Sequence, residues 1–329
     1  MTFRRAPWMI LLAASCALTL VGCGTSVAGL AGQRAERLGA RATDAWQPIP
    51  DAPTARVGAA AAPVGLTLHV LGGSPDGRRA LDRAEAFRAF DQWSALPALP
   101  TARTGLSAVV VPAERVLAIG GQAGGVSLAT VELYSQVAGA WERQSPMPTA
   151  RHDAAAASHG VFAYVAGGTA AGRPTAAFEV FDVRDRSWRQ LPAMPTARTG
   201  AVAARLGQRL VVVGGRTEAG PTGALELYDL DRGVWTKGPA MPTARSHAAF
   251  AVYGHHLFVL GGKAAGGATE VVESFSLGDG AWTTRAPLPV ALHGAVAAKL
   301  GERLVITGGM VEGRASARGW RMPFPFGAR

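Results

Sequence analysis

Short apolar runs separated by turn residues recur along the chain from about residue 44 to about residue 325. In one representative unit, small and apolar residues cover 200–205 and 210–213, Gly214-Gly215 follow, and a third run covers 225–229 before Trp235. Runs of four to eight such residues bounded by Gly, Pro and Asp are typical of β-strands and leave no room for helices. The pattern therefore predicts an all-β chain with four short antiparallel strands in each unit.

The unit occurs six times, with a period of about 47 residues. A diglycine ends the second predicted strand of each unit: Gly72-Gly73, Gly120-Gly121, Gly167-Gly168, Gly214-Gly215, Gly261-Gly262 and Gly308-Gly309. Tryptophans follow at the same period: Trp46, Trp93, Trp141, Trp188, Trp235 and Trp282. Small four-stranded antiparallel sheets repeated around a circle form a β-propeller. Six units predict six blades.

The diglycine, the aromatic residue seven positions before the tryptophan, and the tryptophan itself resemble the kelch motif. The resemblance covers about residues 44–325 and implies a six-bladed kelch β-propeller. The residue types suit that fold, because glycine permits close backbone approach and Tyr228 and Trp235 offer large faces for packing between blades. The alanine-rich first strand of each unit suits a crowded central axis.

The two ends of the repeat region complement each other. Trp46 has no diglycine before it, and Gly308-Gly309 have no tryptophan at the expected distance after them. We therefore expect residues 44–50 to form the outer strand of the last blade, beside strands at 293–299, 303–307 and 319–324. Pairing the two ends removes an open sheet edge and closes the ring.

The N-terminus carries the pattern of a secretion signal. Arg4 and Arg5 precede an apolar run over 8–20, which is shorter than a membrane span. The sequence Leu20-Val21-Gly22-Cys23 resembles the bacterial lipobox, which implies a lipidated Cys23. The predicted organisation is a signal peptide over 1–22, a lipidated cysteine and tether over 23–43, the propeller over 44–325 and a tail over 326–329. An ordinary signal peptide is the alternative.

Lipidation predicts a stable membrane anchor, because several acyl chains bury far more methylene groups than one chain does. Gly24 after the cysteine favours the outer membrane, by analogy with lipoproteins in which an aspartate there retains the protein in the inner membrane. We therefore expect a cell-envelope protein on the periplasmic side or the cell surface. Cys16 lies in the predicted signal peptide, so no disulfide is expected after processing.

Composition and charge argue against nucleic acid as a partner. The formal net charge is +10, but the arginines are dispersed over all units. A nucleic-acid reader needs Lys and Arg gathered on one face together with stacking aromatic residues. No phosphate-binding glycine loop or nucleophile elbow is present either, since the diglycines lack the following Lys-Ser/Thr and helix. No cofactor is expected.

Five units share a Thr-Ala-Arg motif at the predicted start of the blade: Arg56, Arg103, Arg151, Arg198 and Arg245. These residues are candidates for a ligand-binding face, because guanidinium groups bind carboxylates and phosphates in a bidentate manner. The alternative is structural, since the same five units carry a glutamate on the third strand: Glu85, Glu132, Glu179, Glu226 and Glu273. The sixth unit lacks both partners. This correlation favours recurring Arg–Glu ion pairs within the blades.

Three histidines, His152, His247 and His293, lie at the predicted mouth of the ring, and Asp153 lies beside the first of them. These four residues are weak candidates for acid–base catalysis, because imidazole titrates near neutral pH. Their spacing over three units matches no short metal-binding motif, so no metal site is predicted.

Two functions from different classes remain. The first is a membrane-anchored binding or scaffold module that presents one propeller face to a protein, peptide or glycan. The second is a secreted carbohydrate-active enzyme similar to the kelch-type sialic acid mutarotases, with His152, Asp153 and His247 at its mouth. A copper oxidase resembling galactose oxidase would need a further cysteine that the processed chain lacks. We expect the binding module, because fold alone confers no activity.

Overall fold

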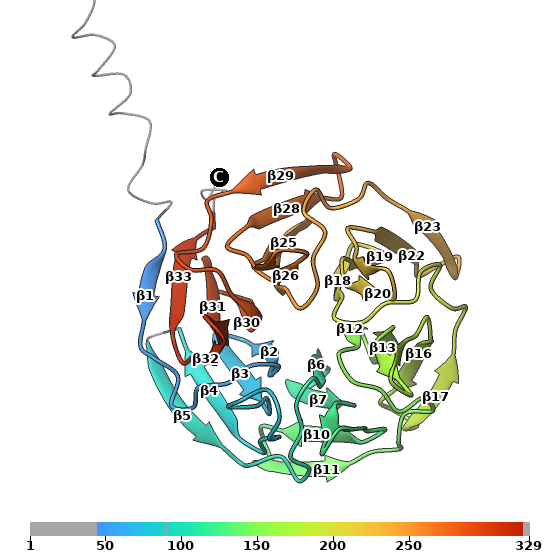
Figure 1. Ribbon diagram of the computed structural model, residues 1–329. Coiled ribbons are helices and arrows are strands. Elements are labelled where there is room, and N and C mark those ends of the chain that lie inside the picture. The colour runs from blue at the N-terminus through green and yellow to red at the C-terminus, as the bar shows by residue number, and fades with distance from the viewer. Residues whose placement is uncertain (1–44, 90, 325–329) are drawn as a thin grey trace, which may run out of the picture. The chain divides into compact units, whose positions relative to one another are not determined.

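The computed structural model describes residues 45–89 and 91–324, which form a ring of β-sheets (Figure 1). Cys23, the predicted signal peptide and tether, Asp44 and the predicted tail lie outside these residues. No helix in the described part of the chain is long and apolar enough to cross a membrane. Six sheets with four strands on each main path surround a central axis, so the predicted fold class is confirmed.

Each of the first five blades is built from consecutive strands. Blade 1 comprises β2 (Ala60–Val64), β3 (Thr67–Leu71), β4 (Ala84–Arg88) and β5 (Gln92–Leu96). Blade 2 comprises β6 (Ser107–Val111), β7 (Arg115–Ile119), β10 (Val131–Ser135) and β11 (Ala140–Arg143). Blade 3 comprises β12 (Ala155–His159), β13 (Phe162–Ala166), β16 (Phe178–Asp182) and β17 (Ser187–Gln190). Blade 4 comprises β18 (Val202–Leu206), β19 (Arg209–Val213), β22 (Leu225–Asp229) and β23 (Val234–Lys237). Blade 5 comprises β24 (Ala249–Tyr253), β25 (His256–Leu260), β28 (Val272–Ser276) and β29 (Ala281–Arg285).

Short hairpins project from the loops after the second strands of blades 2 to 5. They are β8 (Gln122–Ala123) with β9 (Val126–Ser127), β14 (Thr169–Ala170) with β15 (Arg173–Pro174), β20 (Arg216–Thr217) with β21 (Gly220–Pro221), and β26 (Lys263–Ala264) with β27 (Gly267–Ala268). These hairpins rim one face of the ring, where the diglycines end the second strands.

The last blade joins the two ends of the propeller. It comprises β30 (His293–Leu300), β31 (Arg303–Val311), β33 (Gly319–Pro323) and β1 (Gln47–Ile49), while β32 (Arg314–Ala315) pairs with the extended end of β31. β1 is antiparallel to β33, with Pro48 opposite Trp320. The N-terminal strand therefore closes the ring as predicted, although it is shorter than the predicted 44–50.

The hydrophobic core is divided into six clusters, and each lies between two neighbouring blades. The cluster at the closure joins Ile49 of β1 and Val305 of β31 to Leu68, Val70 and Phe87 of blade 1. Both faces of every blade are thus covered by a neighbour, which explains why the strands carry apolar side chains on both faces. No blade can bury its apolar surface alone.

The tryptophans join each blade to the previous one. In blades 1 to 5, the indole Nε1 donates a hydrogen bond of 2.9 Å to a backbone carbonyl in the segment before the blade, as Trp141 does to Pro97. Each indole ring also packs against the aromatic residue opposite it, such as Tyr228 for Trp235. A partly buried indole needs a partner for its single N–H donor. The hydrogen bond therefore holds both the indole and the segment that carries the accepting carbonyl.

The diglycines allow the second strand of one blade to contact the segment that precedes the first strand of the next blade, here called the lead-in. The second glycine of every pair donates its N–H to a carbonyl of the following blade at 2.8–3.0 Å, as Gly215 does to Arg245. A Cβ on Gly214 would lie 2.7 Å from that same carbonyl oxygen, and its φ is +67°. Glycine is required there by both the backbone conformation and the space.

Deleting residues 44–50 should destabilise the whole propeller. The deletion removes β1, uncovers the edge of β33, empties the place of buried Ile49 and removes the carbonyl of Pro50 that accepts from Trp93. We expect a loss greater than the about 2–5 kcal/mol of one large core truncation, measured by urea unfolding. The exposed Gln47→Ala is the control and should change the unfolding free energy by less than about 0.5 kcal/mol. A deletion variant as stable as the parent would contradict closure by β1.

Candidate functional site

A channel runs into the ring along the innermost strands. Its volume is about 260 Å³, and alanines from all six blades contribute to its wall. Each innermost strand pairs on one side only, so its other backbone edge faces the channel. Alternate positions of these strands are partly exposed although they lie inside the ring, as in β6 and β24. The channel is therefore a concave feature to which every blade contributes.

Six equivalent residues form a closed hydrogen-bonded ring at the channel mouth on the hairpin side. They lie two positions after the Arg of each Thr-Ala-Arg motif or its equivalent: Gly58, Gly105, Asp153, Gly200, His247 and Gly294. Each N–H donates to the carbonyl of the equivalent residue in the preceding blade at 2.7–3.0 Å. All six have left-handed backbone conformations, with φ between 51° and 66°. The ring thus joins the backbones of all six blades at the channel mouth.

Asp153 and His247 depart from the glycine pattern of the ring. A left-handed conformation costs a residue with a Cβ roughly 1–2 kcal/mol, although Asp and His tolerate it better than most. Four equivalent positions in the same chain avoid that cost with glycine. Strained residues of this kind persist at functional sites, and the inference runs from the observed outlier to the function. The two positions therefore mark the mouth as the candidate site.

The two side chains meet across the mouth. Asp153 Oδ2 lies 3.4 Å from Nε2 of His247 and 3.9 Å from Nε2 of His152. The side chain of His247 is 31% exposed and that of Asp153 is 23% exposed, so both face the opening. The structure thus brings together three of the four residues that the sequence singled out.

The contact shifts the pKa of both partners. Burial alone would raise the pKa of Asp153, but contact with His247 and the charges of His247 and His152 hold it below its ordinary value. Burial alone would lower the pKa of His247, but contact with Asp153 raises it above its ordinary value despite nearby Lys263 and Arg216. The pair is consequently an ion pair at mildly acidic pH and becomes a carboxylate beside a neutral imidazole as pH rises.

Hydroxyl groups extend the pair to both sides. Ser127 Oγ lies 2.9 Å from Nδ1 of His152, and Ser246 Oγ lies 3.0 Å from Nδ1 of His247. The result is a chain of polar side chains from the β8–β9 hairpin of blade 2, through Asp153, to the lead-in of blade 5. Because both Nδ1 atoms face a hydroxyl, both Nε2 atoms are directed toward the carboxylate.

His293, the fourth candidate, has a different environment. Burial, the charge of His247 and the charge of Lys263 lower its pKa to about 4. It is therefore neutral at physiological pH, beside a histidine whose pKa is raised. The two histidines differ because only His247 contacts the carboxylate.

Arg216 and Lys263 are two cationic residues at this mouth that the sequence analysis did not single out. Both are exposed. Arg216 forms a backbone bridge with Thr199, and Lys263 forms one with Ser246, directly beside the ring. The equivalent positions in the other blades are Ser74, Gln122, Thr169 and Met310. Aligning the repeats on the diglycine would have revealed this pair, since charge appears there only in blades 4 and 5.

The five motif arginines lie inside the blades. Their side chains are 0–2% exposed, and each contacts the glutamate of its own blade: Glu85, Glu132, Glu179, Glu226 and Glu273. The predicted ion pairs are present. The prediction that these arginines form a binding face needs correction, because their guanidinium groups are buried and bonded to glutamates and strand carbonyls.

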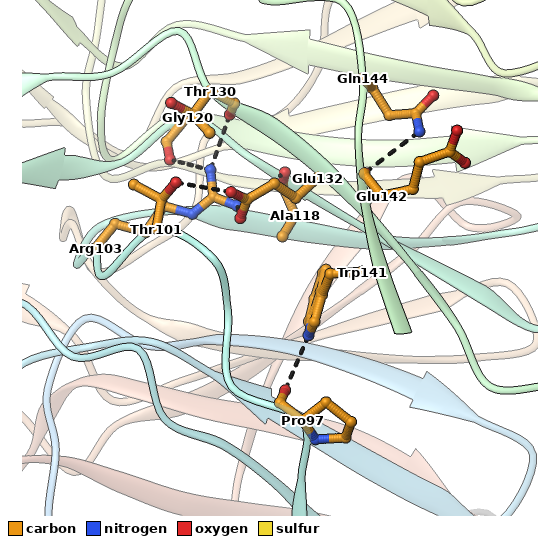
Figure 2. A network of polar contacts seen from close by, with 10 residues as sticks. All are labelled: Pro97, Thr101, Arg103, Ala118, Gly120, Thr130, Glu132, Trp141, Glu142 and Gln144. Carbon is orange, nitrogen blue, oxygen red and sulfur yellow. Dashed lines mark hydrogen bonds and ion pairs between the residues drawn. The ribbon is translucent and has the colours of Figure 1, made fainter. Parts of the chain in front are cut away.

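Figure 2 shows one such buried network in blade 2. Arg103 contacts Glu132 at 2.7 Å and donates to the carbonyls of Gly120, Thr130 and Ala118 at 2.9–3.3 Å. Thr101 donates its hydroxyl to the same carboxylate at 2.7 Å. Burial lowers the pKa of Arg103 to about 10, against the charge of Glu132, so the guanidinium stays charged at neutral pH. Each motif ties the loop to two strands.

Blade 6 shows an apolar solution to the same position. Leu292 replaces the arginine and Trp320 replaces the glutamate, and both belong to the core cluster between blades 5 and 6. Such a replacement is often neutral or stabilising, because a buried ion pair must first overcome desolvation. The ion pairs therefore hold the loop before the first strand in five blades. Blade 6 shows that a blade can form without such a pair.

No group of three or more His, Cys, Asp or Glu side chains among residues 45–89 and 91–324 is arranged to hold a metal ion. Cys23 lies outside the described residues, so its lipidation remains a prediction.

Breaking one buried ion pair should cost far more than replacing it. Arg198→Leu leaves Glu226 buried without its cation and should lower the unfolding free energy by about 3–5 kcal/mol. Arg198→Leu combined with Glu226→Leu should recover most of that loss, as blade 6 suggests. Arg173→Leu breaks an exposed pair with Glu218 and is the control, with an expected effect below about 1 kcal/mol. Equal effects of Arg198→Leu and Arg173→Leu in urea unfolding would refute a structural role.

Comparison with known proteins agrees with the repeat geometry. A family model described as the KLHDC2/KLHL20/DRC7 Kelch-repeats domain matches residues 153–318, and a Kelch motif model matches residues 103–148. No curated protein sequence matches the chain.

A solved structure titled "Structure of YjhT" is similar with a TM-score of 0.72 and 16% sequence identity, covering 85% of this chain and 98% of that one. At this identity the likeness concerns the fold alone. Since the Kelch-repeats domain model spans half of the chain and the blades carry the kelch glycines and tryptophans, this chain belongs to the kelch-repeat family.

Proposed function

We propose that this protein is a membrane-anchored kelch-repeat binding module that takes a polar ligand at the hairpin-rimmed channel mouth. The observation that carries the proposal is the presence of Asp153 and His247 at two left-handed ring positions where the other blades have glycine. The fold does not need these side chains there, and they face the opening. A strained polar pair at the mouth of the main channel is best explained by recognition of a ligand.

The charge of the mouth favours a ligand with an anionic group. Arg216 and Lys263 stand on the blade 4 and blade 5 side, and His247 balances the charge of Asp153 when its imidazole is protonated. The five motif arginines take no part, because they are buried with their glutamates. The ligand class is therefore a glycan, peptide or protein segment that brings an acidic group to this side of the mouth.

His247→Gly should abolish ligand binding without lowering stability. Removing the imidazole takes away one mouth contact, while glycine relieves the left-handed strain of roughly 1–2 kcal/mol. We would screen the parent protein on an array of acidic and neutral glycans and acidic peptides, then measure affinity and thermal unfolding for the variants. Arg216→Ala with Lys263→Ala should weaken an acidic hit by about tenfold. Lys237→Ala on the outer strand β23 is the matched charge control. A hit insensitive to His247 and to both cations would contradict the proposal.

A second candidate is a carbohydrate-active enzyme similar to the kelch-type sialic acid mutarotases. The observation in its favour is the raised pKa of His247 beside Asp153, an arrangement that suits a general acid near neutral pH. The same variants decide between the candidates. Anomer interconversion of N-acetylneuraminic acid, followed by NMR, should be accelerated by the parent and by Lys237→Ala and not by His247→Gly if the enzyme assignment holds. Binding without any turnover supports the module.

The proposed anchor is the thioether-linked lipid on Cys23. Cys23→Ala should release the protein from the membrane fraction and abolish incorporation of an alkyne-labelled palmitate in a bacterial host. Cys16→Ala is the matched control, because Cys16 lies within the predicted signal peptide, and it should leave labelling unchanged. Labelling that survives Cys23→Ala would exclude this anchor.

A further inference from the structure

The side chains of the mouth pair, Asp153 and His247, lie over neighbouring ring glycines. A Cβ on Gly200 would lie 2.7–2.9 Å from three atoms of the His247 imidazole. A Cβ on Gly105 would lie 2.6 Å from Oδ1 of Asp153. Distances below 3.0 Å force a displacement, and the imidazole is itself held on both of its nitrogens. Each of the two side chains thus occupies the space above the ring glycine of the preceding blade.

At the other two ring glycines, an added Cβ would approach different side chains. A Cβ on Gly58 would lie 2.7 Å from Oγ1 of Thr104, and one on Gly294 would lie 2.6 Å from Cγ2 of Val57. Their φ values are 66° and 65°, and those of Gly105 and Gly200 are both 62°. All four glycines therefore satisfy the same backbone requirement. Only at Gly105 and Gly200 would an added Cβ meet a side chain of the mouth pair.

We propose that Gly105 and Gly200 are positioning residues of the mouth, each leaving the space in which Asp153 or His247 must lie for the two side chains to meet. The inference rests on the proposed function of the mouth as a ligand site. Around the ring, glycine and polar residue then alternate over blades 2 to 5 in the order Gly105, Asp153, Gly200, His247. This alternation lets a side chain from blade 5 cross blade 4 and reach a carboxylate on blade 3.

The position of His247 depends on this space because each nitrogen of its imidazole contacts a different residue. Nδ1 is 3.0 Å from Oγ of Ser246, and Nε2 is 3.4 Å from Oδ2 of Asp153. A methyl group on Gly200 would push the imidazole away from the backbone and separate Nε2 from the carboxylate. The groups that face His247 and influence its titration are Asp153, Arg216, Lys263 and His293. Of these, Asp153 alone raises its pKa.

The test is an NMR titration of the imidazole Cε1–H signal of His247 in Gly200→Ala, with Gly58→Ala as the matched control. The control imposes the same left-handed strain at a ring position whose backbone bonds run to Gly294 and Gly105 and to neither Asp153 nor His247. In Gly200→Ala the pKa of His247 should fall toward its ordinary value of about 6.5, because the carboxylate contact is lost. In the control it should stay at the parent value. An unchanged pKa in Gly200→Ala, or an equal fall in Gly58→Ala, would overturn the proposal.

A stability cycle keeps the proposal testable if Gly200→Ala folds poorly. Gly200→Ala should lower the urea midpoint less in the His247→Gly background than in the parent, because the imidazole that the methyl group displaces is gone. The penalty of Gly58→Ala, whose methyl group would meet Thr104 instead, should be the same in both backgrounds. An equal penalty for Gly200→Ala in both backgrounds would overturn the proposal. Neither measurement uses a ligand, so failure of ligand binding and failure of the positioning role give separate results.

Discussion

The structure depends on how closely six sheets can approach one axis. At the mouth, each blade donates a backbone hydrogen bond to the preceding blade, and the six bonds form a closed ring. The diglycines add a second set of backbone bonds that run to the following blade. Both sets require left-handed conformations and leave little space for a Cβ, which is why glycine dominates these positions. The outer strands of each blade are positioned by these two sets of backbone hydrogen bonds near the axis.

The buried Arg–Glu pairs and the tryptophans stabilise the blades at larger radius. The arginine binds strand carbonyls and a glutamate, so it fixes the loop that leads to the axial ring. The tryptophan fixes the segment between two blades through one indole hydrogen bond. Blade 6 manages without the ion pair because Leu292 and Trp320 join an apolar cluster instead. An Arg–Glu ion pair in five blades and an apolar contact in the sixth thus hold the same loop. What each blade requires is a fixed position of the lead-in loop, and a buried charge is one way to provide it.

The mouth combines this scaffold with side chains that the scaffold does not need. Four ring glycines show that the backbone closes without these side chains, so we assign Asp153 and His247 to the candidate site. Their shifted pKa values follow from contact between an acid and an imidazole in a partly buried place, and His293 shows the opposite shift where that contact is missing. The backbones of both residues belong to the closed hydrogen-bonded ring, and a selective site needs such support for its side chains.

The fold could be predicted from the repeat pattern, because six glycine pairs and six tryptophans at one period specify six equal units, and the missing parts at the two ends specify closure. It also identified the Arg–Glu pairs, since both partners are absent together from one unit. Only the tertiary structure showed that His247 reaches Asp153 across Gly200, that the arginines are unavailable to a ligand, and that Arg216 and Lys263 stand at the mouth. Repetition along the chain reveals which positions are equivalent, whereas contacts between side chains of different blades depend on the direction in which each one points from the closed ring.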